Sequence, residues 1–198
     1  MRGDWHTLQA RVDRLGQRIS AVVARLNEFG FRFERPRDVF PGPEAQALRA
    51  IERIESEAGS LPQSLKLFWL RVGSVDLSGH RPEWQGCEYL DQLIVFPPSA
   101  AVEELEEFLS DRGERMRSDN PYCVPIAPDV FHKADVSGGP PYELAVPATE
   151  EDPRLLNALP SVSFLEHVER ALGYGGFPGL ADCPRHTWPL VELVRGDC

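Results

Sequence analysis

Residues Ile51–Gly79 read "IERIESEAGSLPQSLKLFWLRVGSVDLSG" and contain the clearest change of pattern in the chain. Their first apolar residues recur with helical spacing, and Gly59 favours a helix end because glycine readily adopts a left-handed C-cap. Pro62 suits the first turn of a second helix, which Gly73 ends. From Ser74 onward the apolar pieces are short and separated by turns, as is typical of strands. The stretch therefore predicts two helices followed by a change to β-structure.

The rest of the chain continues this mixed pattern. Short apolar segments at 74–77, 91–96, 123–127 and 142–147 are predicted strands. A helix with Ser99 as its N-cap separates the second strand from the third. Ser163 and Glu166 have the spacing of a capping box and predict the start of a last helix. Because helices lead and strands gather in the middle, we expect an α+β fold in which helices pack around a central antiparallel sheet.

The N-terminal segment has the apolar spacing of a helix with a heptad seam. The seam consists of Trp5, Leu8, Val12, Leu15, Ile19, Val22, Leu26 and Phe29. Such a helix could form a coiled coil with a second copy, giving a homodimer, or could lie along its own domain, and we favour the second because three heptads are short for an independent coil. We therefore divide the chain into an N-terminal helical arm and connector at 1–40 and a domain at 41–198.

The charge is unevenly distributed along the chain. Residues 1–40 hold 8 Lys and Arg against 5 Asp and Glu, whereas residues 41–198 hold 13 against 26. An acidic body repels nucleic acids and membrane surfaces and attracts a basic protein partner. These numbers favour a protein partner and argue against binding to nucleic acid or membranes.

Cysteine spacing and hydropathy bear on the compartment. Cys87, Cys123, Cys183 and Cys198 lie far apart and form no C-x-x-C pair, so we expect free thiols in a reducing cytosol. No apolar run approaches the roughly 20 residues that span a bilayer. We therefore expect a soluble, cytoplasmic protein.

The segment 133–147, "KADVSGGPPYELAVP", is the most suggestive candidate for chemistry. A phosphate-binding loop needs consecutive backbone N–H groups, but Pro140 and Pro141 follow the glycines and have none. Ser137 lacks the first glycine of a G-x-S-x-G elbow. Cys183 and His186 form a lone C-x-x-H, which is insufficient for a zinc site. We predict a structural turn here, no metal or other cofactor, and no enzymatic activity.

Two segments resemble the SMI1/KNR4 family, also called the SUKH superfamily. Residues 51–79 are similar to its opening, with an acidic helix, a glycine, and Leu61-Pro62 before a helix that ends in a glycine turn; residues 138–147, "GGPPYELAVP", resemble its later segment. The resemblance covers roughly residues 44–180. It implies helices around a central antiparallel sheet and a non-catalytic role, in many bacterial members as immunity proteins that neutralise polymorphic toxins, often nucleases or deaminases.

These observations together predict a protein-binding domain, most concretely an immunity protein whose acidic surface blocks a basic toxin domain. The candidate partner contacts are Asp76, Glu83, Trp84, Glu88, Asp91, Asp135 and Tyr142. Two alternatives stay open. One is a small hydrolase or transferase that uses Ser137, His132 and Asp135, which are close in sequence. The other is a scaffold that self-associates through its N-terminal helix.

Overall fold

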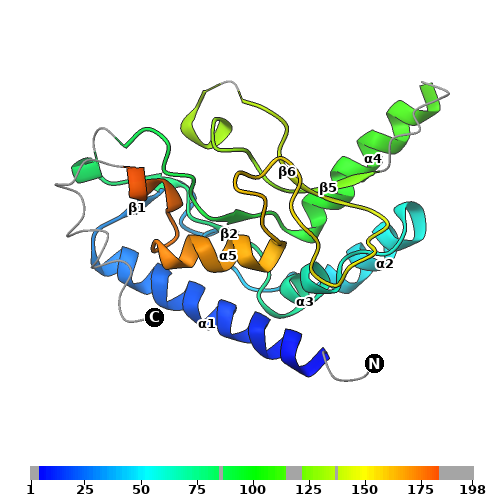
Figure 1. Ribbon diagram of the computed structural model, residues 1–198, viewed down its shortest axis with the longest axis horizontal. Helices are drawn as coiled ribbons and strands as arrows, with labels where there is room; N and C mark the ends of the chain where they lie inside the picture. Colours follow the sequence, from blue (N-terminus) through cyan, green and yellow to red (C-terminus); the bar gives the residue numbers. More distant parts are fainter. Residues whose placement is uncertain (1–4, 85–86, 115–121, 137, 183–198) are drawn as a thin grey trace.

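The structure is a computed structural model, and it describes residues 5–84, 87–114, 122–136 and 138–182 (Figure 1). Its five α-helices are α1 (Trp5–Glu28), α2 (Ala47–Ala58), α3 (Gln63–Arg71), α4 (Pro98–Glu114) and α5 (Phe164–Gly173). Its strands are β1 (Arg32–Phe33), β2 (Val75–Asp76), β3 (Gly79–His80), β4 (Ile94–Val95), β5 (Cys123–Ala127) and β6 (Tyr142–Ala145). Short 3₁₀ turns lie at Pro82–Trp84, His132–Ala134 and Pro178–Asp182.

Helix α1 lies along the chain's own body, where it contacts α3 and α5 (Figure 1). The inner positions of the heptad seam are at most 9% exposed, and they are Leu8, Val12, Leu15, Ile19, Val22 and Leu26. They belong to the same hydrophobic cluster as the core residues of α3 and α5. Burial of this face explains the helix, because packing of an amphipathic stripe supplies most helix stability in proteins.

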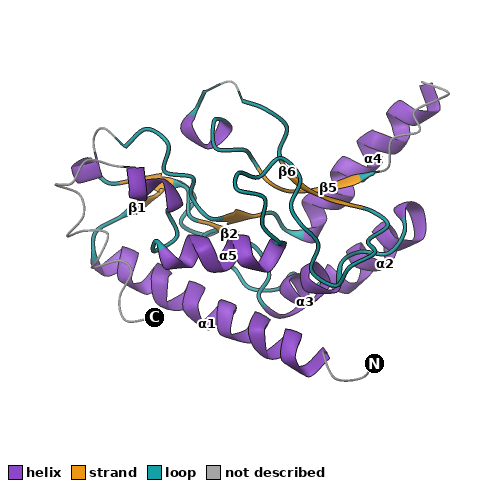
Figure 2. Ribbon diagram, in the orientation of Figure 1, coloured by secondary structure: helices purple, strands orange, loops and turns teal. Residues whose placement is uncertain are grey.

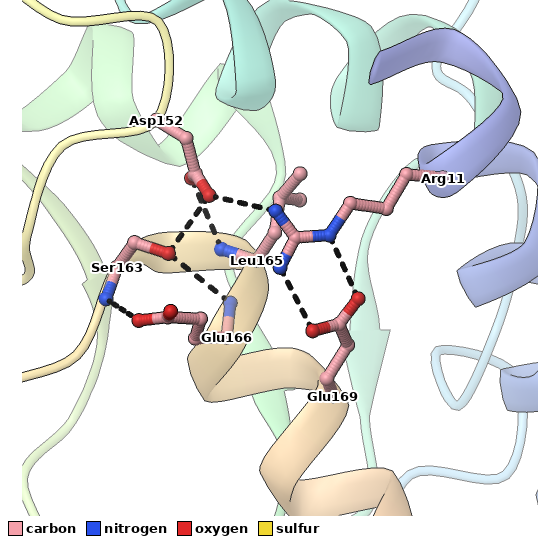
Figure 3. A network of polar contacts seen from close by, with 6 residues as sticks. All are labelled: Arg11, Asp152, Ser163, Leu165, Glu166 and Glu169. Carbon is pink, nitrogen blue, oxygen red and sulfur yellow. Dashed lines mark hydrogen bonds and ion pairs between the residues drawn. The ribbon is translucent and has the colours of Figure 1, made fainter. Parts of the chain in front are cut away.

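A polar network joins α1 to α5 (Figure 3). The Arg11 guanidinium donates to both carboxylate oxygens of Glu169 at 2.7 and 2.8 Å and to Asp152 at 3.3 Å. Asp152 also accepts from the Ser163 hydroxyl and from the Leu165 backbone N–H. The Arg11 ion pair lowers the pKa of the Glu169 carboxyl, with partial burial opposing it. The network fixes the start of α5, the helix that carries His167 and Arg170.

The helix ends follow the sequence pattern closely. Gly59 and Gly73 end α2 and α3 with φ angles of 106° and 93°, which only glycine adopts easily. At Gly73 a Cβ would also lie 2.1 Å from the Gly42 carbonyl oxygen, so a side chain is excluded. Ser163 and Glu166 form the predicted capping box, each side chain bonding the backbone N–H of the other. The prediction of Ser99 as an N-cap is wrong, because α4 begins at Pro98 and the Ser99 hydroxyl donates to Glu44 instead.

The β-structure is antiparallel but more divided than expected (Figure 2). It consists of three two-stranded sheets that pair β1 with β3, β2 with β4, and β5 with β6. The prediction of an α+β fold is confirmed, whereas the strands of the described residues do not join into a single central sheet. A backbone bond from Phe96 to Ile126 links the segment after β4 to β5 without extending either ladder. The β5–β6 pair, with its register shift between Pro125 and Ala127, is the longest of the three.

The prediction of four free thiols is wrong. Cys87 is disulfide-bonded, which overturns the expectation that all four cysteines are free thiols. Cys123 keeps its thiol, whereas Cys183 and Cys198 lie outside the described residues. Within the described ranges, no helix combines the length and the apolar character that crossing a membrane requires.

Candidate functional site

The segment 128–141 connects β5 to β6 and contains the glycine turn that the sequence singled out. Asp129 stabilises this loop by accepting hydrogen bonds from its backbone. Its side chain is only 9% exposed, and it accepts from the His132 backbone N–H at 2.9 Å and from the Gly139 N–H at 2.7 Å. Its Oδ1 also lies 2.7 Å from His132 Nδ1. Burial raises the pKa of Asp129, but these hydrogen bonds and the imidazole outweigh it, and the net pKa is lowered.

Gly138 is required by this arrangement. A Cβ at position 138 would lie 2.3 Å from Asp129 Oδ1 and 2.6 Å from His132 Nδ1, which is closer than side-chain atoms can approach. At Gly139 the nearest atom would be Asp129 Oδ2 at 3.4 Å, an ordinary contact. Asp129 and His132 therefore exclude a side chain at position 138 but not at position 139.

A groove of about 730 Å³ lies on one side of this loop, between α4 and the β5–β6 pair. We call it the acidic groove. Its carboxylates are Glu104, Glu107 and Glu143, and its described lining includes no Lys or Arg. Its apolar wall consists of Phe96, Phe108, Tyr122, Pro125, Pro128 and Pro141. Negative charge therefore lies beside a half-buried apolar surface, and no Lys or Arg among the described lining residues neutralises it.

In the acidic groove, burial is the main cause of two raised pKa values, and the charge of Glu104 adds to both. Burial raises the pKa of Glu143, a hydrogen bond from Asn157 opposes the rise, and the charge of Glu104 adds to it. Burial also raises the pKa of the Tyr122 phenol, again with Glu104 as the next cause. Like charges near low-dielectric walls disfavour ionisation. A bound cation would relieve this repulsion.

A second cavity lies on the other side of the same loop, and we call it the apolar-rimmed cavity. Its volume is about 770 Å³, and Asp91, Asp129 and Tyr142 are among its lining residues. Behind them Lys133 has a side chain that is 1% exposed; its ammonium lies 2.7 Å from Asp91 and 4.8 Å from the centre of the Tyr142 ring. Burial lowers the pKa of Lys133, with the Asp91 ion pair opposing. The buried pair anchors the wall of the cavity.

The structure brings together only some of the predicted partner contacts. Asp91 and Tyr142 lie in one cavity wall, with the Tyr142 hydroxyl 3.4 Å from Asp91 Oδ1. Tyr142 is nevertheless only 5% exposed. Trp84 is 4% exposed and packs between Phe31 and Phe177 in the core, so it is not available to a partner.

The remaining predicted contacts are scattered. Asp76 lies in β2 and pairs with Arg35 at 3.5 Å. Glu88 and Asp135 are exposed, and Asp135 has a left-handed φ of 56°. The side chain of Glu83 lies outside the described part of the chain.

The residues of the hydrolase alternative are arranged differently from the expectation. The partner of His132 is Asp129 rather than Asp135, and Ser137 lies outside the described residues. Cys123 lines the acidic groove together with His132, which places a thiol and an imidazole in one groove. However, burial and then Glu143 raise the pKa of Cys123, and this works against the thiolate that a nucleophile requires.

The sequence reasoning missed Glu104, Glu143, Asp129 and His167. The first two are separated by 39 positions, so only the fold shows that they share a groove. His167 is only 7% exposed. Among the described residues, no three His, Cys, Asp or Glu side chains gather in a way that could hold a metal ion.

Comparisons with protein-family models, curated proteins and solved structures find no match for this chain.

Proposed function

We propose that this protein is a non-enzymatic binding domain that takes a basic protein partner at the acidic groove, most concretely an immunity protein that neutralises a toxin domain. The observation that carries the proposal is a groove with three carboxylates, aromatic walls and no Lys or Arg among its described lining residues. An Arg or Lys side chain fits this chemistry, because its aliphatic stem can cover apolar surface while its charge meets the carboxylates.

A toxin that binds phosphate groups through basic residues could bind the carboxylates of the acidic groove in place of its substrate. The acidic body, 13 Lys and Arg against 26 Asp and Glu over residues 41–198, would also speed the encounter. The resemblance to SMI1/KNR4 proteins supports the same role. The cytoplasmic location that this role implies is part of the proposal, and the Cys87 disulfide is a reason to test it because disulfides are rare in a reducing cytosol.

The experiment measures binding to basic toxin-like proteins encoded beside this gene, by calorimetry at low and high salt. The variants Glu104→Gln and Glu143→Gln each remove one groove carboxylate. The control Glu150→Gln removes the same charge from an exposed residue that does not line the groove.

We expect binding that weakens with salt, with a loss of about fivefold or more for each groove variant and little change for the control, since one desolvated ion pair is worth about 1 kcal/mol or more. If Glu150→Gln weakens binding as much as the groove variants do, only the overall charge matters and the groove is not the site. Salt-insensitive binding would reject the electrostatic mechanism.

A further inference from the structure

The apolar-rimmed cavity carries a second inference, independent of the acidic groove. Four of its lining residues are large apolar side chains that remain exposed: Tyr89 (43%), Phe131 (46%), Leu156 (41%) and Leu159 (94%). Tyr89 and Phe131 meet edge to face, with ring centroids 5.7 Å apart. Exposed apolar groups that gather at the rim of a cavity are typical of a binding site, whereas isolated ones are not.

The inner end of this cavity contains a buried polar group without a partner. A small pocket of about 30 Å³ shares Asp91, Tyr142 and Arg170 with the larger cavity, and His167 lines it. The His167 ring packs edge to face on Tyr142 at 5.3 Å, and its Nε2 has no hydrogen-bond partner among the described residues. Because buried polar atoms are nearly always satisfied, this nitrogen marks a place for a ligand atom or a water.

The charges around His167 favour an anion at this end. Asp91 is paired with Lys133 at 2.7 Å. Arg170 is exposed, lines both pockets and makes no ion pair with any described residue. Burial lowers the pKa of His167 to about 4, Lys133 and Arg170 lower it further, and Asp91 opposes them. The imidazole is therefore neutral near pH 7, and beside it Arg170 supplies a positive charge that no described residue pairs.

The outer lining also contains carboxylates. Asp129 is occupied by the three nitrogens that hold the loop. Asp182 is exposed at the rim and opposes an anion, so it adds selectivity against ligands with a second negative charge. A single negative charge placed at the inner end, with an apolar body toward the rim, satisfies both ends of the cavity.

We propose that the apolar-rimmed cavity binds a small apolar monocarboxylate, with its carboxylate between Arg170 and the Nε2–H of His167 and its hydrocarbon part against Phe131, Leu156 and Leu159. The tautomer that carries hydrogen on Nε2 donates to the carboxylate, and the guanidinium pairs with it. The volume of about 770 Å³ bounds the ligand to the size of an ordinary small metabolite. The pocket beside His167 has room for only a water-sized group, so the carboxylate lies at the junction of the two pockets.

The test uses octanoate as the probe and the full chain, followed by ¹H–¹⁵N NMR titration. Octanamide has the same hydrocarbon tail without the charge and separates carboxylate recognition from apolar partition. Arg170→Gln removes the cation, and Leu159→Ser removes a rim side chain that is 94% exposed, so both variants should fold. Arg49→Gln, an exposed cation on α2, is the matched charge control.

We expect saturable binding of octanoate that weakens at least fivefold in Arg170→Gln and in Leu159→Ser and is unchanged in Arg49→Gln. Octanamide should bind at least tenfold more weakly. The proposal is overturned if octanoate does not saturate, if acid and amide bind equally, or if neither variant changes the affinity. In those cases an ordered water is the better partner for His167. Failure here would leave the proposed role of the acidic groove untouched.

Discussion

Replacing Gly138 by alanine tests whether Asp129 holds the loop that separates the acidic groove from the apolar-rimmed cavity. The new Cβ would lie 2.3 Å from Asp129 Oδ1, whereas carbon needs about 3.5 Å at its optimum. The carboxylate must therefore move by about 1 Å. That shift would lengthen the 2.7 Å bond from the Gly139 N–H beyond the hydrogen-bonding range of about 3.5 Å and weaken the contact with His132.

The cost follows from the number of bonds affected. Each hydrogen bond to a charged acceptor contributes about 1.5–3 kcal/mol net, two are affected, and water at the half-exposed loop recovers part of the loss. Alanine also restricts the unfolded chain, which returns about 0.4–1 kcal/mol. We therefore expect Gly138→Ala to lower the free energy of unfolding by about 2–3 kcal/mol, measured by urea denaturation with linear extrapolation.

Gly139→Ala is the matched control for this prediction. It adds the same methyl group to the neighbouring residue, where the nearest atom is 3.4 Å away and the N–H to Asp129 is kept. Its stability should stay within about 1 kcal/mol of the wild type. If the two variants are equally stable, Asp129 does not hold the loop in the way described.

Three further predictions concern buried groups. Lys133→Met should lower the free energy of unfolding by about 3 kcal/mol, because it leaves the Asp91 carboxylate without its ion-pair partner. The double variant Lys133→Met, Asp91→Asn should lose less stability than the sum of the two single variants. Strict additivity in denaturation experiments would contradict the ion pair. The pKa of His167 is about 4 in the folded state and about 6.5 in the unfolded state. Between these values the unfolded state binds a proton that the folded state does not, so the protein becomes less stable as the pH falls below 6.5. The stability difference between the wild type and His167→Gln should therefore fall by about 2–3 kcal/mol from pH 7 to pH 4.5, and a pH-independent difference would refute the buried neutral imidazole. Finally, the Cys87 disulfide predicts two reactive thiols in the denatured chain before reduction and four after reduction. Four thiols in both samples would show that the bond does not form.

Local features of this chain could be predicted from the sequence because they depend on neighbouring residues. The capping box at Ser163 and Glu166 and the helix ends at Gly59 and Gly73 depend on residues a few positions apart. The division into three small sheets could not be predicted, since it depends on pairings such as Phe33 with Gly79 that are distant in the chain. Strands of two residues give little periodicity from which to infer a partner.

The candidate sites show the same limit. Asp91 and Tyr142 were predicted as surface contacts, and the fold does bring them to one cavity wall. Trp84 could not be distinguished from a contact residue, because only packing against Phe31 and Phe177 places it in the core. The pairing of Asp129 with His132 is the one missed feature with a local signal, an Asp three residues before a His in a loop.

The burial of the α1 seam means that the first 28 residues cannot be treated as a detachable appendage. Its six inner side chains, at most 9% exposed, would each contribute about 1.5–3 kcal/mol by leaving water, or about 9–18 kcal/mol in all. Whole domains are stable by only about 5–15 kcal/mol. A chain shortened to begin at Glu44 would therefore be markedly less stable and would expose a hydrophobic strip on α3 and α5. During synthesis, the apolar face of α1 can meet α3 early but is covered fully only after α5 has been made, because α1 packs on both helices.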